Sequence, residues 1–243
     1  MDKFISDFTA IFQNDKMFWT FLGGTWETLY STFIATAVAY ILGLALGIAL
    51  TVGEENGIHP LPRPLMKVLN VVINILRSMP FLLLMILCLP LSGLLVGTEI
   101  GTAASIPPLI IAAAPFVARL VETSFREVDR GVLEAAQSMG CSTFQIIWKV
   151  ILPESKPSLI AGFATAFITI LGYGAMAGFI GGGGLGMIAT TYGYNRYNDA
   201  VMLVAVVIIV ILVQIFQSLG TRLSIRSDKR ITRISRQKKN KSK

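Results

Sequence analysis

Long apolar stretches separated by short polar segments dominate this chain. Five of them approach the ~20 residues that a helix needs to cross a bilayer, and we expect membrane helices at residues 26–52, 65–95, 106–120, 157–179 and 200–219. Pro80 interrupts the second stretch, and Gly43 and Gly47 give the first the spacing of small residues that lets two helices approach closely. The pattern predicts an all-α integral membrane protein with five transmembrane helices.

A polar segment between the third and fourth stretches predicts a helix-turn-helix. In residues 131–140, Glu134, Ala135 and Ala136 favour a helix, and Gly140 can adopt the left-handed backbone that ends one. A second amphipathic helix is expected to end at Leu152 and Pro153, with apolar positions Phe144, Ile147, Trp148 and Ile151. A structured polar loop of this length indicates contact with another molecule. The alternative is an amphipathic loop that lies among the lipid headgroups.

Composition agrees with a membrane protein. The chain is 53% hydrophobic and 14% charged, whereas soluble domains carry about 25% charged residues. Its net charge of +7 comes from the C-terminus, because residues 222–243 hold ten Lys or Arg and one acid, Asp228. Beside a membrane helix, such a tail predicts a cytoplasmic segment that contacts anionic lipid, and we favour this over binding of nucleic acid.

The basic residues also predict the orientation of the chain. Seventeen lie in one set of connections, which includes the polar loop and the C-terminus, and three lie in the other set, with Arg77 left out. The positive-inside rule then places the C-terminus in the cytoplasm and the N-terminus outside. We divide the chain into an N-terminal amphipathic segment on the membrane surface (1–25), a transmembrane domain (26–223) and a basic cytoplasmic tail (224–243).

The sequence offers little for covalent chemistry or cofactor binding. It contains no Gly-x-x-x-x-Gly-Lys-Ser/Thr loop for phosphate, and its one histidine, His59, has no partner set for a metal. A glycine-rich run matches Gly-x-Gly-x-x-Gly but follows a membrane helix instead of a strand, so we reject nucleotide binding. We expect a flexible or tightly turned outer loop, or a re-entrant turn, at Gly181, Gly182, Gly183, Gly184 and Gly186.

Four further residues are candidates for a transport pathway. Arg77 either faces the interior of the helix bundle with a partner, or extends its side chain to the headgroups. Pro80 bends its helix and frees a backbone carbonyl. Tyr173 and Met176 lie among small residues and could line a pathway for an apolar side chain, although helix packing explains the same pattern.

The polar loop resembles a motif of a known family. Glu134-Ala135-Ala136, three residues, Gly140 and a run that ends in Leu-Pro are similar to the EAA loop of ABC importer permeases, which docks on the ATP-binding subunit. Residues 26–223 further resemble the permeases of methionine ABC importers. The matching stretches are 26–29, 74–81, 96–98, 100–101, 112–116, 119–122, 134–140, 150–154, 172–186, 192–194 and 217–220.

This resemblance implies a type I ABC importer permease fold and transport of methionine into the cell by alternating access. It implies a permease homodimer, two ATP-binding subunits that hold ATP and Mg²⁺, and a substrate-binding lipoprotein outside. Glu134, Ala135, Ala136 and Gly140 would couple to the ATPase, and Tyr173 and Met176 would lie near a gate at the dimer axis. The chain itself would bind no cofactor and catalyse no reaction.

Two alternatives remain open from the sequence. The same machinery could import another amino acid or a quaternary amine, although no aromatic cage for a cationic head is evident in the apolar stretches. An ion-coupled carrier would need acidic residues within the membrane helices, and Glu99, Glu122 and Asp199 lie only at their edges.

Overall fold

The computed structural model describes residues 8, 9, 11, 13, 15–55 and 57–228. Every regular element among them is helical, as predicted. The elements are α2 (Asp15–Val52), α3 (Arg63–Ser78), α4 (Phe81–Val96), α5 (Thr102–Arg126), α6 (Arg130–Ser138), α7 (Thr143–Ile146), a π-helical turn (Ile147–Ile151), α8 (Leu152–Ala177), a 3₁₀ turn (Gly178–Ile180), α9 (Gly184–Ile188), a second π-helical turn (Ala189–Tyr194) and α10 (Asp199–Ser227).

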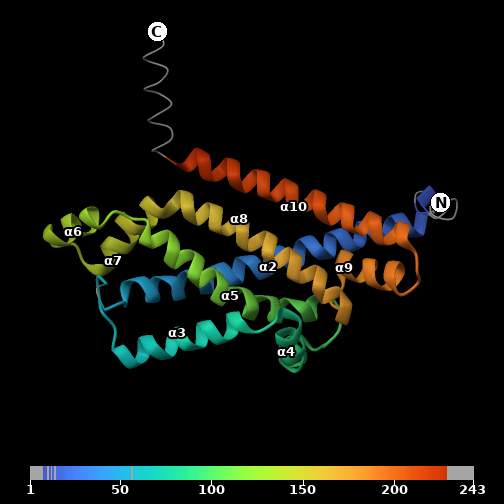
Figure 1. Ribbon diagram of the computed structural model, residues 1–243, viewed down its shortest axis with the longest axis horizontal. Coiled ribbons are helices and arrows are strands. Elements are labelled where there is room, and N and C mark those ends of the chain that lie inside the picture. Colours follow the sequence, from blue (N-terminus) through green and yellow to red (C-terminus); the bar gives the residue numbers. More distant parts are fainter. Residues whose placement is uncertain (1–7, 10, 12, 14, 56, 229–243) are drawn as a thin grey trace, which may run out of the picture.

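The long helices run side by side, with α6 and α7 at one end of the molecule and α9 at the other (Figure 1). α2 and α5 form the closest pair. A Cβ atom added at Gly43 or Gly47 would lie 2.5 Å from a methyl group of Val117 or Val121, respectively. The close approach predicted from the spacing of these two glycines is therefore confirmed, and its partner is α5.

Four helical stretches are long and apolar enough to cross a membrane: α2, α5, the stretch that contains α8, and α10. A fifth is obtained if α3 and α4 together make one span, but these two helices meet at an angle of 108°. The break falls at the predicted position, since α3 ends at Ser78 and α4 begins directly after Pro80. Its sharpness follows from Pro80, which has no N–H to donate to α3.

Several helices extend beyond the spans and segments predicted from the sequence. The helix of the first span starts at Asp15, so no break separates the N-terminal segment from the transmembrane domain at residue 25. α5 extends beyond both ends of the predicted span, and α10 continues past Leu223 to Ser227. The second helix of the polar hairpin does not end at Pro153, because a π-helical turn joins it to α8. The rest of the predicted tail, residues 229–243, lies outside the described residues.

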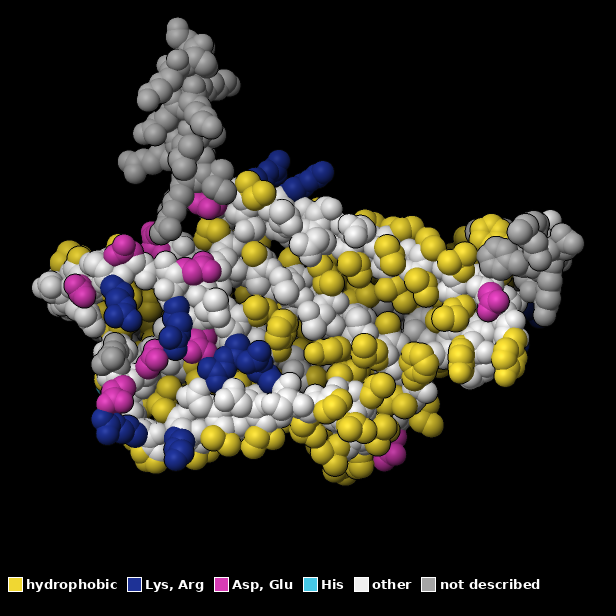
Figure 2. Space-filling model, in the orientation of Figure 1, with side chains coloured by type: hydrophobic (Ala, Val, Ile, Leu, Met, Phe, Trp, Pro, Cys, Tyr) yellow, Lys and Arg dark blue, Asp and Glu magenta, His cyan; other side chains and the backbone are white. Residues whose placement is uncertain are grey.

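Charged and apolar side chains occupy different parts of the surface (Figure 2). Lys and Arg gather over α3 and toward the α6 end, and hydrophobic side chains cover the parts around α4 and α9. α10 is the least buried of the long apolar helices, with 17% of its most apolar window inside the molecule. It packs on α8 through Gly220, where an added Cβ would lie 2.1 Å from that of Ala164.

Candidate functional site

The polar hairpin is built by local backbone contacts. Asp129 caps α6 by accepting a hydrogen bond from the N–H of Gly131 at 2.7 Å. At the other end Gly140 adopts φ +77°, and Cys141 donates to the carbonyl of Ala136 at 3.2 Å, the long-range bond of a Schellman motif. Ser142 and Gln145 then form a capping box that starts α7. The helix-turn-helix and its stop at Gly140 are confirmed.

The candidate coupling residues divide by exposure. Glu134, Ala135 and Gly140 are exposed, and nothing lies within 4 Å of a Cβ added at Gly140. Ala136 is 2% exposed and packs against Val128 and other residues in the core beneath the hairpin. Our expectation that Ala136 shapes the contact with a partner is therefore wrong for its side chain. Ala136 instead packs α6 against the body of the protein.

The hairpin also exposes large apolar side chains. Met139 is 76% exposed, Phe144 68% and Trp148 59%, and the rings of Phe144 and Trp148 lie 5.9 Å apart. The sequence pattern placed Phe144 and Trp148 on one apolar stripe with Ile151, but Ile151 is buried. The π-helical turn has more than 3.6 residues per turn, so it separates positions that an α-helix would align. The amphipathic period was therefore misread at this point.

A cavity of about 400 Å³ lies between the hairpin and the adjoining ends of α2 and α5. Its charged lining residues are Glu54, Arg126, Arg130 and Glu134. Arg126 pairs with Glu54 at 3.1 Å across the cavity wall. The hairpin thus lies next to the C-terminal ends of α2 and α5, and its buried residues Ala136 and Ile146 share a core cluster with Phe125 of α5.

Sequence reasoning missed an ionic network that starts at this cavity. Glu122 is 8% exposed and bonds to Arg119 at 2.7 Å and to Arg126 at 2.8 Å. Arg119 also donates to the side-chain oxygens of Asn70 at 2.7 Å and Asn74 at 3.0 Å on α3. Glu122 lies about one turn before the end of α5, near the edge of its helix as expected. The spacing i, i+3, i+7 of Arg119, Glu122 and Arg126 was the available signal.

The glycine-rich run is a tight and largely buried turn, which is one of the alternatives that the sequence left open. Gly181, Gly183 and Gly184 have positive φ, and Gly182, Gly183, Gly184 and Gly186 are buried. The carboxylate of Glu27 on α2 accepts a hydrogen bond from the N–H of Gly184 at 2.8 Å and from the hydroxyl of Thr102 at 2.9 Å. Thr28 accepts from Leu185 at 2.9 Å. The alternative of a re-entrant turn that needs protein around its backbone matches this arrangement.

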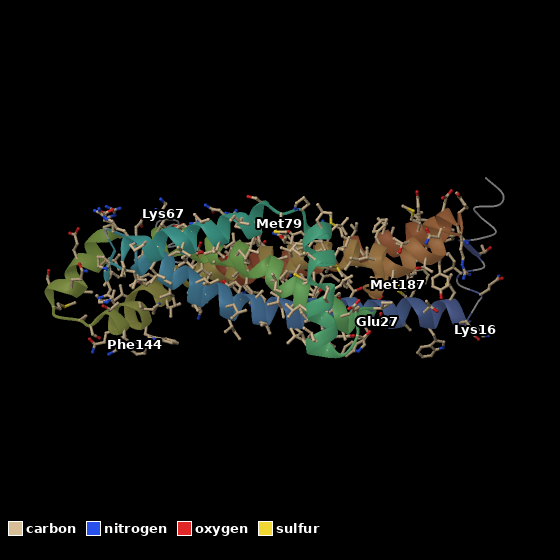
Figure 3. The ribbon with its side chains drawn as sticks, turned by 90° about the horizontal axis from the view of Figure 1, so that it is seen from below. Lys16, Glu27, Lys67, Met79, Phe144 and Met187 are labelled. Atoms are coloured by element: carbon tan, nitrogen blue, oxygen red, sulfur yellow. The ribbon has the colours of Figure 1, made fainter. Side chains whose placement is uncertain are left out.

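The two ends of the molecule therefore carry different sites, as Figure 3 shows for labelled residues. Phe144 lies at the hairpin end, whereas Glu27 and Met187 lie toward the other end, and Met79 lies between them. Glu27 had no role in the sequence interpretation. The signal would have been a carboxylate inside an apolar helix, which needs hydrogen-bond donors around it.

The candidate pathway residues come together only in part. Tyr173 on α8 stacks on Phe81 at the start of α4, with ring centroids 4.4 Å apart and planes 4° apart. Arg77 is exposed and lines the same recess as Tyr173, whereas Met176 is 47% exposed and is not among the residues that line it. The break at Pro80 places Phe81 at the start of α4, where its ring stacks on that of Tyr173.

Comparison with known proteins identifies the chain. Residues 59–228 match the model of the family described as binding-protein-dependent transport system inner membrane component. The chain belongs to this family. It is therefore an inner membrane component of such a transport system. The matched region includes the hairpin, the ionic network and the glycine turn, so all three belong to the family domain.

Individual members of this family are closely similar. The methionine import system permease protein of Bacillus subtilis is 51% identical over 154 residues, 63% of this chain and 69% of the relative. The D-methionine transport system permease protein of Escherichia coli K12 is 40% identical over 165 residues, 68% of this chain and 76% of the relative. A solved structure of the methionine ABC transporter MetNI in inward-facing conformations superposes with a TM-score of 0.86 at 39% identity, over 89% of this chain and all of that one. The fold is accordingly that of a type I ABC importer permease.

Proposed function

We propose that this protein is the membrane-spanning subunit of an ATP-driven importer and that its substrate is methionine. Similarity to methionine permeases along most of the chain is the observation that supports the substrate. Transport would proceed by alternating access, in which two copies of the chain tilt against each other. The described residues of this chain would then bind and guide the substrate without covalent chemistry.

ATP-binding subunits supply the energy in this proposal. Each of the two permease copies would receive one such subunit, and ATP with Mg²⁺ would bind there. The hairpin of α6 and α7 is the proposed contact, because it exposes Glu134 beside the apolar side chains of Met139, Phe144 and Trp148. Exposed aromatic and methionine side chains suit a protein interface. Since Ala136 and Ile146 of the hairpin share a core cluster with Phe125 of α5, rigid-body motion of the ATPase would be passed to α5.

A substrate-binding lipoprotein would deliver methionine from the other side of the membrane. We expected it near the glycine run, but those glycines are buried. Exposed residues on the same end of the molecule include Tyr194 (66%) and Tyr197 (87%), where the second π-helical turn leads into α10. We propose this connection as the docking surface, with the N-terminus outside and the C-terminus in the cytoplasm as the distribution of basic residues predicts.

Uptake by the reconstituted complex tests the proposal. Liposomes that contain the permease and its ATPase, with the binding protein outside the membrane, should accumulate radiolabelled methionine only when ATP is present on the ATPase side. Excess unlabelled methionine should abolish the signal, and betaine should leave it unchanged. Inhibition by betaine but not by methionine would refute the substrate. Accumulation by the permease alone would refute the dependence on an ATPase and revive an ion-coupled carrier.

A further inference from the structure

The break between α3 and α4 forms a small recess with an arginine at its rim. Arg77 lies in the last turn of α3, and the recess has a volume of about 130 Å³. The other residues that line it are Leu76, Met79, Phe81, Leu84, Ala112, Phe116 and Tyr173. Arg77 is thus the one charged residue in an otherwise apolar and aromatic lining.

Arg77 has neither an ion pair nor a side-chain hydrogen bond within the described part of the chain, while the carboxylates that contact α3 or its neighbour α5 pair with other arginines. Glu122 is shared by Arg119 and Arg126, and Glu55 pairs with Arg63. Arginine in a membrane-embedded region pairs with a counter-charge or faces water. Its helix has a polar stripe that repeats every three or four residues, and Asn70 and Asn74 of this stripe accept hydrogen bonds from Arg119 of α5. The stripe consists of Lys67, Asn70, Asn74 and Arg77.

The backbone at the same break offers the opposite charge. Met79 is extended, with φ −74° and ψ 131°, and Pro80 has no N–H, so α3 cannot continue. The last four carbonyls of a helix have no partners within it, and they carry the negative end of the helix dipole. A cationic group at this end of α3 would therefore find backbone acceptors that have no partner within the helix.

An apolar wall completes the recess. Phe81 and Tyr173 form a stacked pair, and Met79 and Phe116 add a thioether and a third ring. Sulfur and aromatic rings attract one another, so this wall suits a thioether or an unbranched apolar side chain. The recess has a volume of about 130 Å³ and opens to the surface through the exposed Arg77. It can hold the polar end of an amino acid, with the rest extending into the open.

We propose that this recess is a binding subsite for a zwitterionic amino acid, in which Arg77 binds the α-carboxylate and the terminal carbonyls of α3 receive the ammonium group. A guanidinium matches a carboxylate with two parallel hydrogen bonds, which lysine cannot reproduce. The proposal rests on the function proposed above and places a contact for the substrate on the permease itself. The side chain of the substrate then lies against Phe81 and Tyr173.

Protection of an introduced cysteine tests this subsite directly. Met79→Cys is made in a chain that also carries Cys88→Ser and Cys141→Ser, and the assembled permease–ATPase complex is placed in nanodiscs. Alkylation of the permease chain by a neutral thiol reagent is followed by mass spectrometry with increasing methionine or methioninol. Methioninol keeps the ammonium and the thioether but lacks the carboxylate. We expect methionine to protect at a concentration at least tenfold lower than methioninol.

Changes at Arg77 then decide the role of its guanidinium. The ratio of the protecting concentrations of methioninol and methionine should fall from at least ten to about one in Arg77→Gln. In Arg77→Lys this ratio should be intermediate. Lys67→Gln, on the same stripe but outside the recess, should leave it unchanged. Equal protection by the two compounds in the chain with Arg77, or an unchanged preference in Arg77→Gln, would overturn the subsite. If Arg77→Gln does not assemble, Arg77→Lys decides instead: a reduced preference supports the subsite, and an unchanged preference overturns it.

ATP-driven methionine uptake, measured in parallel with the unsubstituted complex, separates this proposal from the proposed function. If that complex imports methionine and the protection pattern fails, only the subsite is wrong. If it imports no methionine, the proposed function is wrong and the subsite with it.

Discussion

The two ends of this protein use the same structural devices for opposite purposes. At the hairpin end, caps at Asp129 and Ser142 and a left-handed Gly140 shape a loop that exposes its side chains. At the other end, left-handed glycines form a turn that is buried under α2 and α5, with Glu27 bonded to its backbone. Local caps and turns hold the hairpin, so most of its side chains stay available to another protein. A turn held by distant side chains is part of the internal structure.

This difference predicts how each end responds to substitution. Changes at the glycine turn should disturb the fold, because its neighbours come from three other helices. Changes on the exposed part of the hairpin should disturb function while the isolated permease stays stable. Measurements of thermal stability and of transport therefore separate the two ends.

The largest effect on stability is expected for Gly183→Ala. Gly183 has φ +75°, and an added Cβ would lie 1.9 Å from the hydroxyl oxygen of Thr102. Backbone strain and overlap together should cost about 3 kcal/mol or more. Thermal unfolding of the purified permease in detergent should show a large fall in Tm, or the protein should fail to accumulate.

Gly97→Ala is the matched control for this substitution. Gly97 also has a positive φ, +81°, but nothing lies within 4 Å of an added Cβ. Only the cost of the left-handed backbone remains, about 1 to 2 kcal/mol. Equal losses of stability in the two variants would show that strain alone, and not the contact with Thr102, fixes the glycine turn.

Removal of the carboxylate beneath the turn should have the next largest effect. Glu27→Ala leaves the N–H of Gly184 and the hydroxyl of Thr102 without their acceptor, which should cost about 2 kcal/mol. Glu99→Ala, an exposed carboxylate between α4 and α5, should change stability by less than about 0.5 kcal/mol. Additive effects of Glu27→Ala and Thr102→Val on Tm would argue against the hydrogen bond between these residues.

The contrast between the ends also explains what the sequence could predict. The hairpin was found because its signals are local: helix formers, then a glycine, then a second periodic stretch within about twenty residues. The burial of the glycine turn was not predicted, because its partners Glu27, Thr28 and Thr102 lie far away in sequence. Glycines that permit close packing and glycines that permit flexibility look alike in a single sequence.

The ends of the helices differ from the predicted apolar spans for a related reason. Hydrophobicity ended the third span near Leu120, yet α5 continues through Glu122 to Arg126, because these charges pair with each other and with Arg119. Pairing between side chains is not visible in a hydropathy profile. Likewise, the π-helical turn at Ile147–Ile151 carries the helix past Pro153 and shifts the amphipathic period, and periodicity alone assumes one regular helix.

Charge reversal on the hairpin should affect transport but not the fold. Glu134 is exposed, so Glu134→Arg should change the Tm of the isolated permease little. If α6 contacts the ATPase, reversal of this charge should reduce ATP-driven uptake by about tenfold, equivalent to about 1.4 kcal/mol of binding. Glu154→Arg, in the first turn of α8 beyond the hairpin, is the control and should retain uptake. Full uptake by Glu134→Arg, with normal assembly, would remove the support for coupling at this position.

The smallest effect is expected at the cap of the second hairpin helix. Ser142 accepts a hydrogen bond from the N–H of Gln145 at 3.4 Å, and the side chain of Gln145 accepts one from the N–H of Ser142 at 2.9 Å. Ser142→Ala removes the first of these and should destabilise α7 by about 1 kcal/mol. Hydrogen exchange of the complex without nucleotide should show faster exchange confined to the turn around Gln145, with Tm of the whole chain nearly unchanged. Ser138→Ala, an exposed position inside α6, should not change exchange there. If Ser142→Ala instead lowers Tm as much as Glu27→Ala does, the hairpin is an integral part of the fold, and the distinction between the two ends is lost.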